Sequence, residues 1–208
     1  MKTCVPRLAD VPGSSSTESL ILDSARRELA VSGILGLRVA EVANGAHCSI
    51  TNIYRYFGDR DGLLARVLGD MYDEFTRSAI DTYLGHFADR HDLTVQDLAD
   101  RIPFPTSPEA IRIQAFRLQI LAAATENPRL HARLEEISQN RMIRWREGVQ
   151  FLRERMAPGE EFDERVFYVV LANLMPYYNH LLGESKLTEA EFQRFIADKL
   201  RCNPQPRN

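Results

Sequence analysis

The nine residues Ser49–Phe57, SITNIYRYF, combine three aromatic rings with an arginine, an asparagine and a threonine. On a helix, Ile50, Ile53 and Phe57 share one face, because residues three and seven positions apart lie on the same side. Thr51, Tyr54 and Arg55 lie on another face, flanked by Asn52 and Tyr56. The stretch therefore predicts a helix with one anchored apolar side and one side that carries donors, a cation and ring edges.

That polar side has the chemistry of a helix that reads DNA. Arginine pairs with guanine, asparagine with adenine, and threonine contacts the methyl group of thymine. Tyrosine hydroxyls, and an arginine at the start of the next helix, suit phosphates. The candidate DNA contacts from this pattern are Thr51, Asn52, Tyr54, Arg55, Tyr56 and Arg60. The alternative for each is an ordinary exposed residue, or a ring packed between helices.

The flanking sequence predicts two more short helices. Ser15 followed by Glu18 has the pattern of a capping box and predicts a helix start, and Gly33 is expected to end that helix in a left-handed cap. A second helix is predicted over residues 39–45. Ser49 caps the helix over residues 50–56, and Asp59 caps a longer helix from Arg60 to about Tyr83. Three short helices with the third as reader predict a helix-turn-helix.

From Ile21 to Leu68 the sequence resembles the N-terminal domain of the TetR family of bacterial transcriptional regulators. The resemblance rests on a set of matching residues: Ile21-Leu22-Asp23, Gly33, Val42-Ala43, Ile53-Tyr54-Arg55-Tyr56-Phe57, Arg60 and Leu63-Leu64. It implies a homodimeric, sequence-specific regulator, expected to be a repressor, that binds a palindromic operator in double-stranded DNA and a small-molecule effector.

Two residues depart from the family pattern. Arg38 stands where the family usually has a hydroxyl residue that caps the second helix; arginine cannot cap, but it can reach a phosphate, and we include it among the candidate DNA contacts. His47 stands where the family usually has glycine. If that position needs a positive φ, histidine tolerates it better than most residues.

The remainder of the chain is helical by pattern, which predicts an all-α fold of about nine helices. Helices are expected near residues 94–101, after Ser107-Pro108, over residues 128–156 and over residues 162–182, with a last helix capped by Thr188 and Glu191. The predicted organisation is an N-terminal arm (1–14), a helix-turn-helix DNA-binding domain (15–66), an effector-binding and dimerisation domain (67–201) and a tail (202–208).

The second domain offers candidates for two kinds of contact. Those for the effector are Phe116, Arg141, Met142, Trp145, Asn173 and Tyr177. Those for the dimer interface are Phe167, Val170, Leu174, Phe192, Phe195 and Ile196. Plain core packing, or for Arg141 a structural ion pair, is the alternative. The row of Asn173, Tyr177 and His180 suits either a pocket or a partner subunit, and Pro176 is expected to kink its helix.

Composition and the absence of known motifs exclude several classes of protein function. The net charge of −3 disfavours nonspecific coating of nucleic acid, and no apolar run approaches a membrane span. Phosphate-loop, hydrolase and zinc motifs are lacking, and the three cysteines are far apart, so we expect a cytoplasmic protein that is not an enzyme and has no metal or cofactor. The main rival is a helical protein-interaction module that kept the three-helix head without sequence-specific DNA binding.

Overall fold

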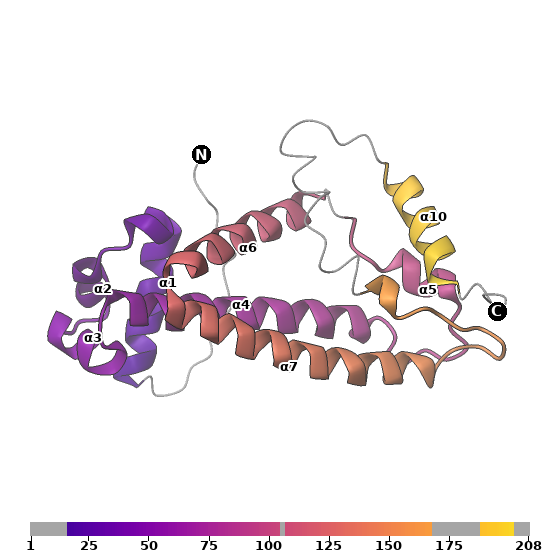
Figure 1. The fold of residues 1–208 in the computed structure, drawn as a ribbon, viewed down its shortest axis with the longest axis horizontal. Coiled ribbons are helices and arrows are strands. Elements are labelled where there is room, and N and C mark those ends of the chain that lie inside the picture. The colour runs from indigo at the N-terminus through magenta and orange to yellow at the C-terminus, as the bar shows by residue number, and fades with distance from the viewer. Residues whose placement is uncertain (1–15, 105–106, 168–187, 202–208) are drawn as a thin grey trace. The chain divides into compact units, whose positions relative to one another are not determined.

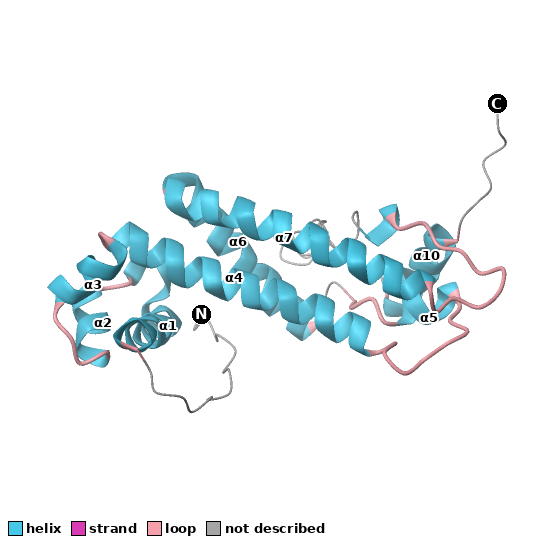
Figure 2. Cartoon of the chain, turned by 90° about the horizontal axis from the view of Figure 1, so that it is seen from below, coloured by secondary structure: helices cyan, strands magenta, loops and turns pink. Residues whose placement is uncertain are grey.

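A computed structural model of the protein describes residues 16–104, 107–167 and 188–201, and these include eight helices whose two ends are both described (Figures 1 and 2). The helices are α1 (Thr17–Gly36), α2 (Val39–Gly45), α3 (Ile50–Phe57), α4 (Arg60–Gly85), α5 (Val95–Asp100), α6 (Pro108–Glu126), α7 (Pro128–Arg153) and α10 (Glu189–Leu200). The only β structure within these ranges is a pair of isolated bridges. The prediction of an all-α fold is therefore confirmed.

Side-chain caps begin four helices at the predicted places. In each, the oxygen of the capping residue accepts a hydrogen bond from a backbone N–H three residues later, which satisfies a donor that the first turn leaves without a partner. The pairs, with their oxygen–nitrogen distances, are Ser49–Asn52 (3.1 Å), Asp59–Gly62 (2.8 Å), Ser107–Ala110 (3.2 Å) and Thr188–Glu191 (3.3 Å). The predicted starts of α3, α4, α6 and α10 are thus confirmed.

The first helix differs from its prediction at both ends. Its cap is Ser16, which accepts from the N–H of Ser19 at 3.2 Å, rather than Ser15, which lies outside the described residues. Gly33 has the positive φ expected of it, 71°, and breaks the helix there. One further turn follows and ends at Gly36, so the left-handed residue is a kink and not the end.

Two predicted boundaries farther along the chain are wrong. The helix α7 ends at Arg153 and not at Met156, because Met156 lies in a bridge with Leu93. The helix expected from Phe162 begins instead at Arg165, since Phe162 belongs to the second isolated bridge. The rest of that predicted helix, residues 168–182, lies outside the described residues.

The chain divides into two compact units. Unit 1 comprises residues 1–75 and 116–139, and unit 2 comprises residues 76–115 and 140–208. The division falls within α4, α6 and α7, so each of these helices contributes residues to both units. The functional domains predicted from sequence, 15–66 and 67–201, follow chain order, whereas the compact units do not.

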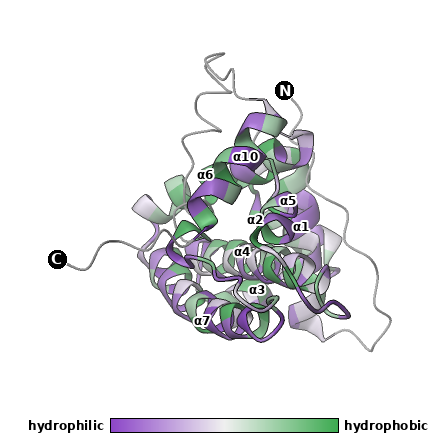
Figure 3. Ribbon diagram, turned by 90° about the vertical axis from the view of Figure 1, so that its right-hand side faces the viewer, coloured by the Kyte–Doolittle hydropathy of each residue, from purple (hydrophilic) through white to green (hydrophobic). Residues whose placement is uncertain are grey.

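Unit 1 has a core to which all three short helices contribute. Its fully buried members come from α1 through α4 and from the parts of α6 and α7 that belong to the unit: Ile21, Ala25, Val42, Ile53, Leu63, Val67, Leu68, Ile120 and Leu130. Hydrophobic and hydrophilic residues lie side by side on the helices (Figure 3), as amphipathic helices around a core require. Residues 116–139 therefore belong to the same core as the helix-turn-helix.

Unit 2 is built around five contacting aromatic rings. The buried members are Tyr83, Phe87, Trp145, Phe162 and Phe167, with ring centroids 5.1–6.3 Å apart. We call them the aromatic cluster. Most of the pairs meet edge to face, which adds about 0.5–1.5 kcal/mol per pair beyond the area that they bury. The Tyr83 hydroxyl donates to the Leu98 carbonyl at 3.0 Å, so that buried polar group is satisfied.

Candidate nucleic-acid interface

The helix α3 is anchored mainly by one fully buried side chain. Within α3, which the structure describes throughout, Ile53 is the only buried residue, with an exposed fraction of 0%. Phe57 packs against the same core while partly exposed, and Ile50 is 41% exposed. Burying Ile53 contributes about 1.5–3 kcal/mol. The expected anchored face is therefore narrower than its sequence pattern, since Ile50 does not belong to it.

The predicted polar face of α3 is open. Thr51, Tyr54, Arg55 and Tyr56 are exposed, and Asn52 is partly exposed. Thr51, Tyr54 and Arg55 share one side of the helix, because they are three and four positions apart. The guanidinium of Arg55 lies 5.4 Å from the ring centroid of Tyr56, a cation–π contact that orients it. Donors, a cation and rings are thus presented together, as groove recognition requires.

The turn between α2 and α3 shows why a glycine is usual there. His47 adopts a φ of 52°, so the histidine does occupy the left-handed region, as the comparison with the family pattern anticipated. Its N–H donates to the Asn44 carbonyl at 3.2 Å, and the N–H of Cys48 donates to the Ala43 carbonyl at 3.0 Å. These bonds hold the turn despite the unfavourable residue.

Close approach of α1 and α2 fixes the angle between them. The buried Ser24 hydroxyl donates to the Val42 carbonyl at 2.9 Å. A Cβ at Gly45 would lie 2.4 Å from the Ser24 oxygen, a distance that real Cβ atoms do not reach. Gly45 is therefore required for this contact, and the contact places α2 ahead of α3.

Arg38 occupies the N-cap of α2 and makes no capping hydrogen bond with its side chain, as expected for an arginine there. Its Nε lies 3.4 Å from the Glu28 carboxylate and its Nη1 4.0 Å from that of Glu41. The side chain is 66% exposed. Surface pairs of this kind are weak, so the guanidinium remains available to a phosphate.

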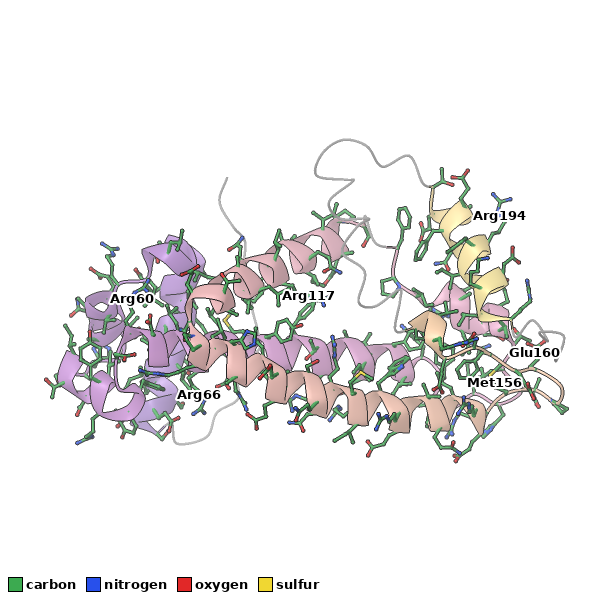
Figure 4. The ribbon with its side chains drawn as sticks, viewed as in Figure 1. Arg60, Arg66, Arg117, Met156, Glu160 and Arg194 are labelled. Carbon is green, nitrogen blue, oxygen red and sulfur yellow. The ribbon has the colours of Figure 1, made fainter. Side chains whose placement is uncertain are left out.

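Arg60 has a structural role that the sequence did not reveal. Its guanidinium donates to three backbone carbonyls at the end of α1 and just beyond: Ile34 (3.2 Å), Leu35 (3.3 Å) and Leu37 (3.3 Å). The labelled side chain lies among the helices of unit 1 (Figure 4). These bonds satisfy carbonyls that the end of a helix leaves free. No local feature of the sequence indicates that Arg60 donates to these carbonyls.

The junction of α3 and α4 is held by residues of the α6–α7 turn. The Arg129 guanidinium makes a two-pronged pair with Asp59, with Nη1–Oδ1 at 3.1 Å and Nη2–Oδ2 at 2.6 Å. Asn127 donates to the Asp61 carbonyl at 2.9 Å. The N–H of Gly62, and after it the Arg129 guanidinium, lower the pKa of the Asp59 carboxyl below its ordinary value. We call residues 57–62, with Asn127 and Arg129, the α3–α4 corner.

The candidate effector contacts are divided between the units. Phe116 is partly buried beside the core of unit 1, whereas Arg141, Met142 and Trp145 belong to unit 2. Trp145 is 3% exposed within the aromatic cluster, and its buried indole Nε1 has no hydrogen-bond partner among the described residues. Asn173 and Tyr177 lie outside the described residues, as do His180 and Pro176.

Of the four candidate dimer contacts that the structure describes, three are core residues of their own subunit. Phe167, Phe192 and Ile196 expose 1%, 6% and 1% of their surfaces within unit 2, which corrects the expectation that they face a partner. Phe192 packs edge to face on Phe104 at 5.7 Å. Phe195, in contrast, is 55% exposed. Val170 and Leu174 lie outside the described residues.

Two features are absent from the part of the chain that the structure describes. No cluster of three or more histidine, cysteine, aspartate or glutamate residues suited to a metal ion occurs among them. None of their helices combines the length and the apolar character that crossing a membrane demands.

Comparison with known proteins identifies what this arrangement resembles. Residues 21–67 match the family described as bacterial regulatory proteins, tetR family. No curated protein matches the sequence. A protein of Mesorhizobium loti MAFF303099, assigned to the TetR-family transcriptional regulators, has a similar structure, with a TM-score of 0.59, 20% identity and coverage of 88% of this chain and 92% of that one.

Two other solved structures share the fold. One is the multidrug binding protein EbrR in complex with imidazole, with a TM-score of 0.56, 18% identity and coverage of 91% of this chain and 98% of that one. The other comes from Rhodococcus sp. and is likewise assigned to the TetR family, with a TM-score of 0.51, 20% identity and coverage of 88% and 95%. The fold is thus shared well beyond residues 21–67.

Proposed function

We propose that the chain is a TetR-family transcriptional regulator and that it binds a palindromic operator in double-stranded DNA as a homodimer, through α3 of each subunit. The observation that carries the proposal is the contrast on α3 between the buried Ile53 and the open side with Thr51, Tyr54 and Arg55. Two such helices reach successive major grooves when they lie about 34–36 Å apart.

DNA contacts divide into two classes in this proposal. Arg55, Asn52 and Thr51 read base edges, because their side chains match the pairing groups of guanine, adenine and thymine. The Tyr54 and Tyr56 hydroxyls and the Arg38 guanidinium bind phosphates. Arg60 contributes mainly by holding the end of α1, since its donors already bond to carbonyls.

We further propose that the protein is a repressor and that a small molecule bound in unit 2 releases it from DNA. The structural similarity to EbrR, a multidrug binding protein, supports a ligand of this kind. The buried Trp145 Nε1, which lacks a partner among the described residues, supports an apolar ligand with one hydrogen-bond acceptor. Such a ligand shifts the equilibrium only by its difference in affinity between the DNA-bound and free conformations.

The dimer interface in this proposal uses the exposed side of α10, where Phe195 is a large hydrophobic residue that is exposed in the single subunit. Analytical ultracentrifugation of the wild type and of Phe195→Glu tests that assignment. Dissociation of the variant into monomers is expected; an unchanged dimer would exclude this side of α10.

The deciding experiment selects bound sequences from random duplex DNA and then measures binding to the selected site. Arg55→Ala is expected to weaken binding to that site by about 1–3 kcal/mol and to leave binding to a scrambled duplex nearly unchanged. Arg146→Ala, which removes an exposed arginine of α7, is the control for charge. Equal losses on both duplexes would make Arg55 a phosphate contact, and failure to select any sequence would favour the protein-interaction alternative.

A further inference from the structure

The α6–α7 turn reaches the start of α4 through a buried amide. Asn127 is 6% exposed, and its Oδ1 accepts from the N–H groups of Arg129 and Leu130, both at 3.1 Å, which caps α7. Its Nδ2 donates to the Asp61 carbonyl at 2.9 Å. Serine and aspartate also cap helices well, but neither has a second group that donates. The residue type thus fits a role beyond capping.

Arg129, two residues after Asn127, reaches the same junction. Its fork binds both oxygens of Asp59, and Asp59 at the same time caps α4 through the N–H of Gly62. One carboxylate therefore links the first turn of α4 to the first turn of α7. A paired, planar fork of this kind fixes direction as well as distance, which a single-point contact does not.

The last turn of α3 is joined to this junction through its backbone. Gly58 has a φ of 82°, and its N–H donates to the Tyr54 carbonyl at 2.8 Å, which caps α3. A Cβ at Gly62 would lie 1.8 Å from the Phe57 carbonyl oxygen and 2.6 Å from the Arg129 Nη1. The Phe57 carbonyl at the end of α3 and the Arg129 side chain thus both lie close to Gly62 in the first turn of α4.

We propose that the α6–α7 turn positions the recognition helix: Asn127 and Arg129 set the orientation of α3, and hence DNA affinity, without contacting DNA. The inference rests on the proposed DNA binding by α3. It makes two residues that lie some seventy positions beyond α3 determinants of operator binding. Arg129 acts through Asp59 and through its Nη1, which donates to the Phe57 carbonyl at 3.5 Å, and Asn127 acts through the first turn of α4.

The direction in which one substitution changes DNA affinity separates a positioning role for Arg129 from direct contact with DNA. Asp59→Asn keeps the cap of α4, because asparagine caps as well as aspartate does, but it removes the charge that Arg129 binds. If Arg129 were a phosphate contact, freeing it and deleting a nearby negative charge would tighten DNA binding. If Arg129 positions α3, the same change weakens DNA binding.

The experiment measures operator affinity and amide hydrogen exchange for Asp59→Asn, Arg129→Gln, their double variant and Asn127→Ser, which retains a cap for α7. We expect each single change to weaken operator binding about threefold to tenfold. The double variant should bind no more weakly than the single variant with the lower affinity, because the effects of coupled residues are not additive. The amides of Tyr56 and Phe57 should exchange faster in each variant.

The matched control is Arg133→Gln. Arg133 also joins α7 to α4 within unit 1, through Asp70 at 3.6 Å, but one turn farther along α7 from the corner. Its affinity should stay within about twofold of the wild type.

Three results would overturn the proposal. One is tighter or unchanged DNA binding by Asp59→Asn. Another is a loss of DNA affinity in Arg129→Gln together with a smaller salt dependence of binding, by the amount expected for about one phosphate contact. The third is unchanged exchange of the α3 amides in all variants, and this readout needs no DNA. Failure of the wild type to bind any duplex would instead count against the proposed function.

Discussion

Aromatic residues are used in opposite ways on α3 and in the aromatic cluster of unit 2. On α3, Tyr54 and Tyr56 are 41% and 43% exposed, whereas in the aromatic cluster of unit 2 Phe87 and Phe167 are 0% and 1% exposed. The cluster stabilises itself, because each ring buries the next. The rings on α3 contribute little to folding, so α3 must be held in other ways: by Ile53 and by its two ends. The rings of α3 can therefore stay exposed because Ile53 and the two ends hold the helix.

Removing a ring from the cluster should have the largest effect. Phe87→Ala is expected to destabilise the protein by about 3–5 kcal/mol, because it deletes a fully buried side chain and leaves a cavity. Urea unfolding measures the change. Ile143→Ala, which truncates a side chain that is 53% exposed, should change stability by no more than about 0.5 kcal/mol. Equal costs for the two variants would show that the cluster does not form a core.

Adding one methyl group at the α3–α4 corner tests whether α3 depends on its ends. Gly62→Ala should cost about 1–3 kcal/mol of stability, since the new Cβ would lie 1.8 Å from the Phe57 carbonyl oxygen. It should also weaken operator binding. Gly85→Ala is the matched change at the other end of α4, where a Cβ meets nothing within 4 Å. Thermal melts that rank Gly85→Ala as the more harmful change would refute the idea.

Removing a hydroxyl from α3 should separate recognition from stability. Tyr54→Phe is expected to weaken operator binding by about 0.5–1.5 kcal/mol, the value of one hydrogen bond, and to leave the melting temperature unchanged because the ring stays in place. Titration of the selected duplex and a thermal melt give both numbers. A drop in melting temperature without a loss of affinity would mean that Tyr54 packs rather than binds.

The start of α5, in unit 2, is stabilised by a charged carboxylate, and acid should remove that stabilisation. Hydrogen bonds from the Thr94 side chain and backbone, and then from Arg90, lower the pKa of Asp97 to about 2 from an ordinary 3.8. The folded pKa is the lower one, so the stabilisation is present above about pH 4 and is lost as the pH falls through about 2.

Asp97→Asn should therefore cost about 0.5–1 kcal/mol near neutral pH and almost nothing near pH 2. Melts of both proteins across this range measure the difference. A difference that persists at the acid end would assign the effect to packing rather than charge.

Local patterns were enough to predict the parts of the fold that depend on near neighbours. Ser49 caps α3 through Asn52, and Thr188 caps α10 through Glu191, because these bonds join residues three positions apart. The open side of α3 followed from helical periodicity alone. The family resemblance drew attention to position 47, which usually holds glycine, and His47 does have a positive φ there.

Long-range partners could not be predicted in this way. Periodicity gives the direction of an apolar face but not what covers it, so Phe192 and Ile196 were assigned to a partner subunit although they pack in their own. The acceptors of Arg60 lie 23 to 26 positions earlier in the chain, and Asp59 lies 70 positions before Arg129. No local pattern in the sequence encodes those pairs.

Trp145 is the chain's one tryptophan, and it lies in the aromatic cluster, shielded from water. Its intrinsic fluorescence is therefore a reporter that belongs to unit 2 alone. Emission from a shielded indole lies at short wavelength and shifts to the red when water reaches it. An effector that enters the cluster would change this signal directly, without any added label.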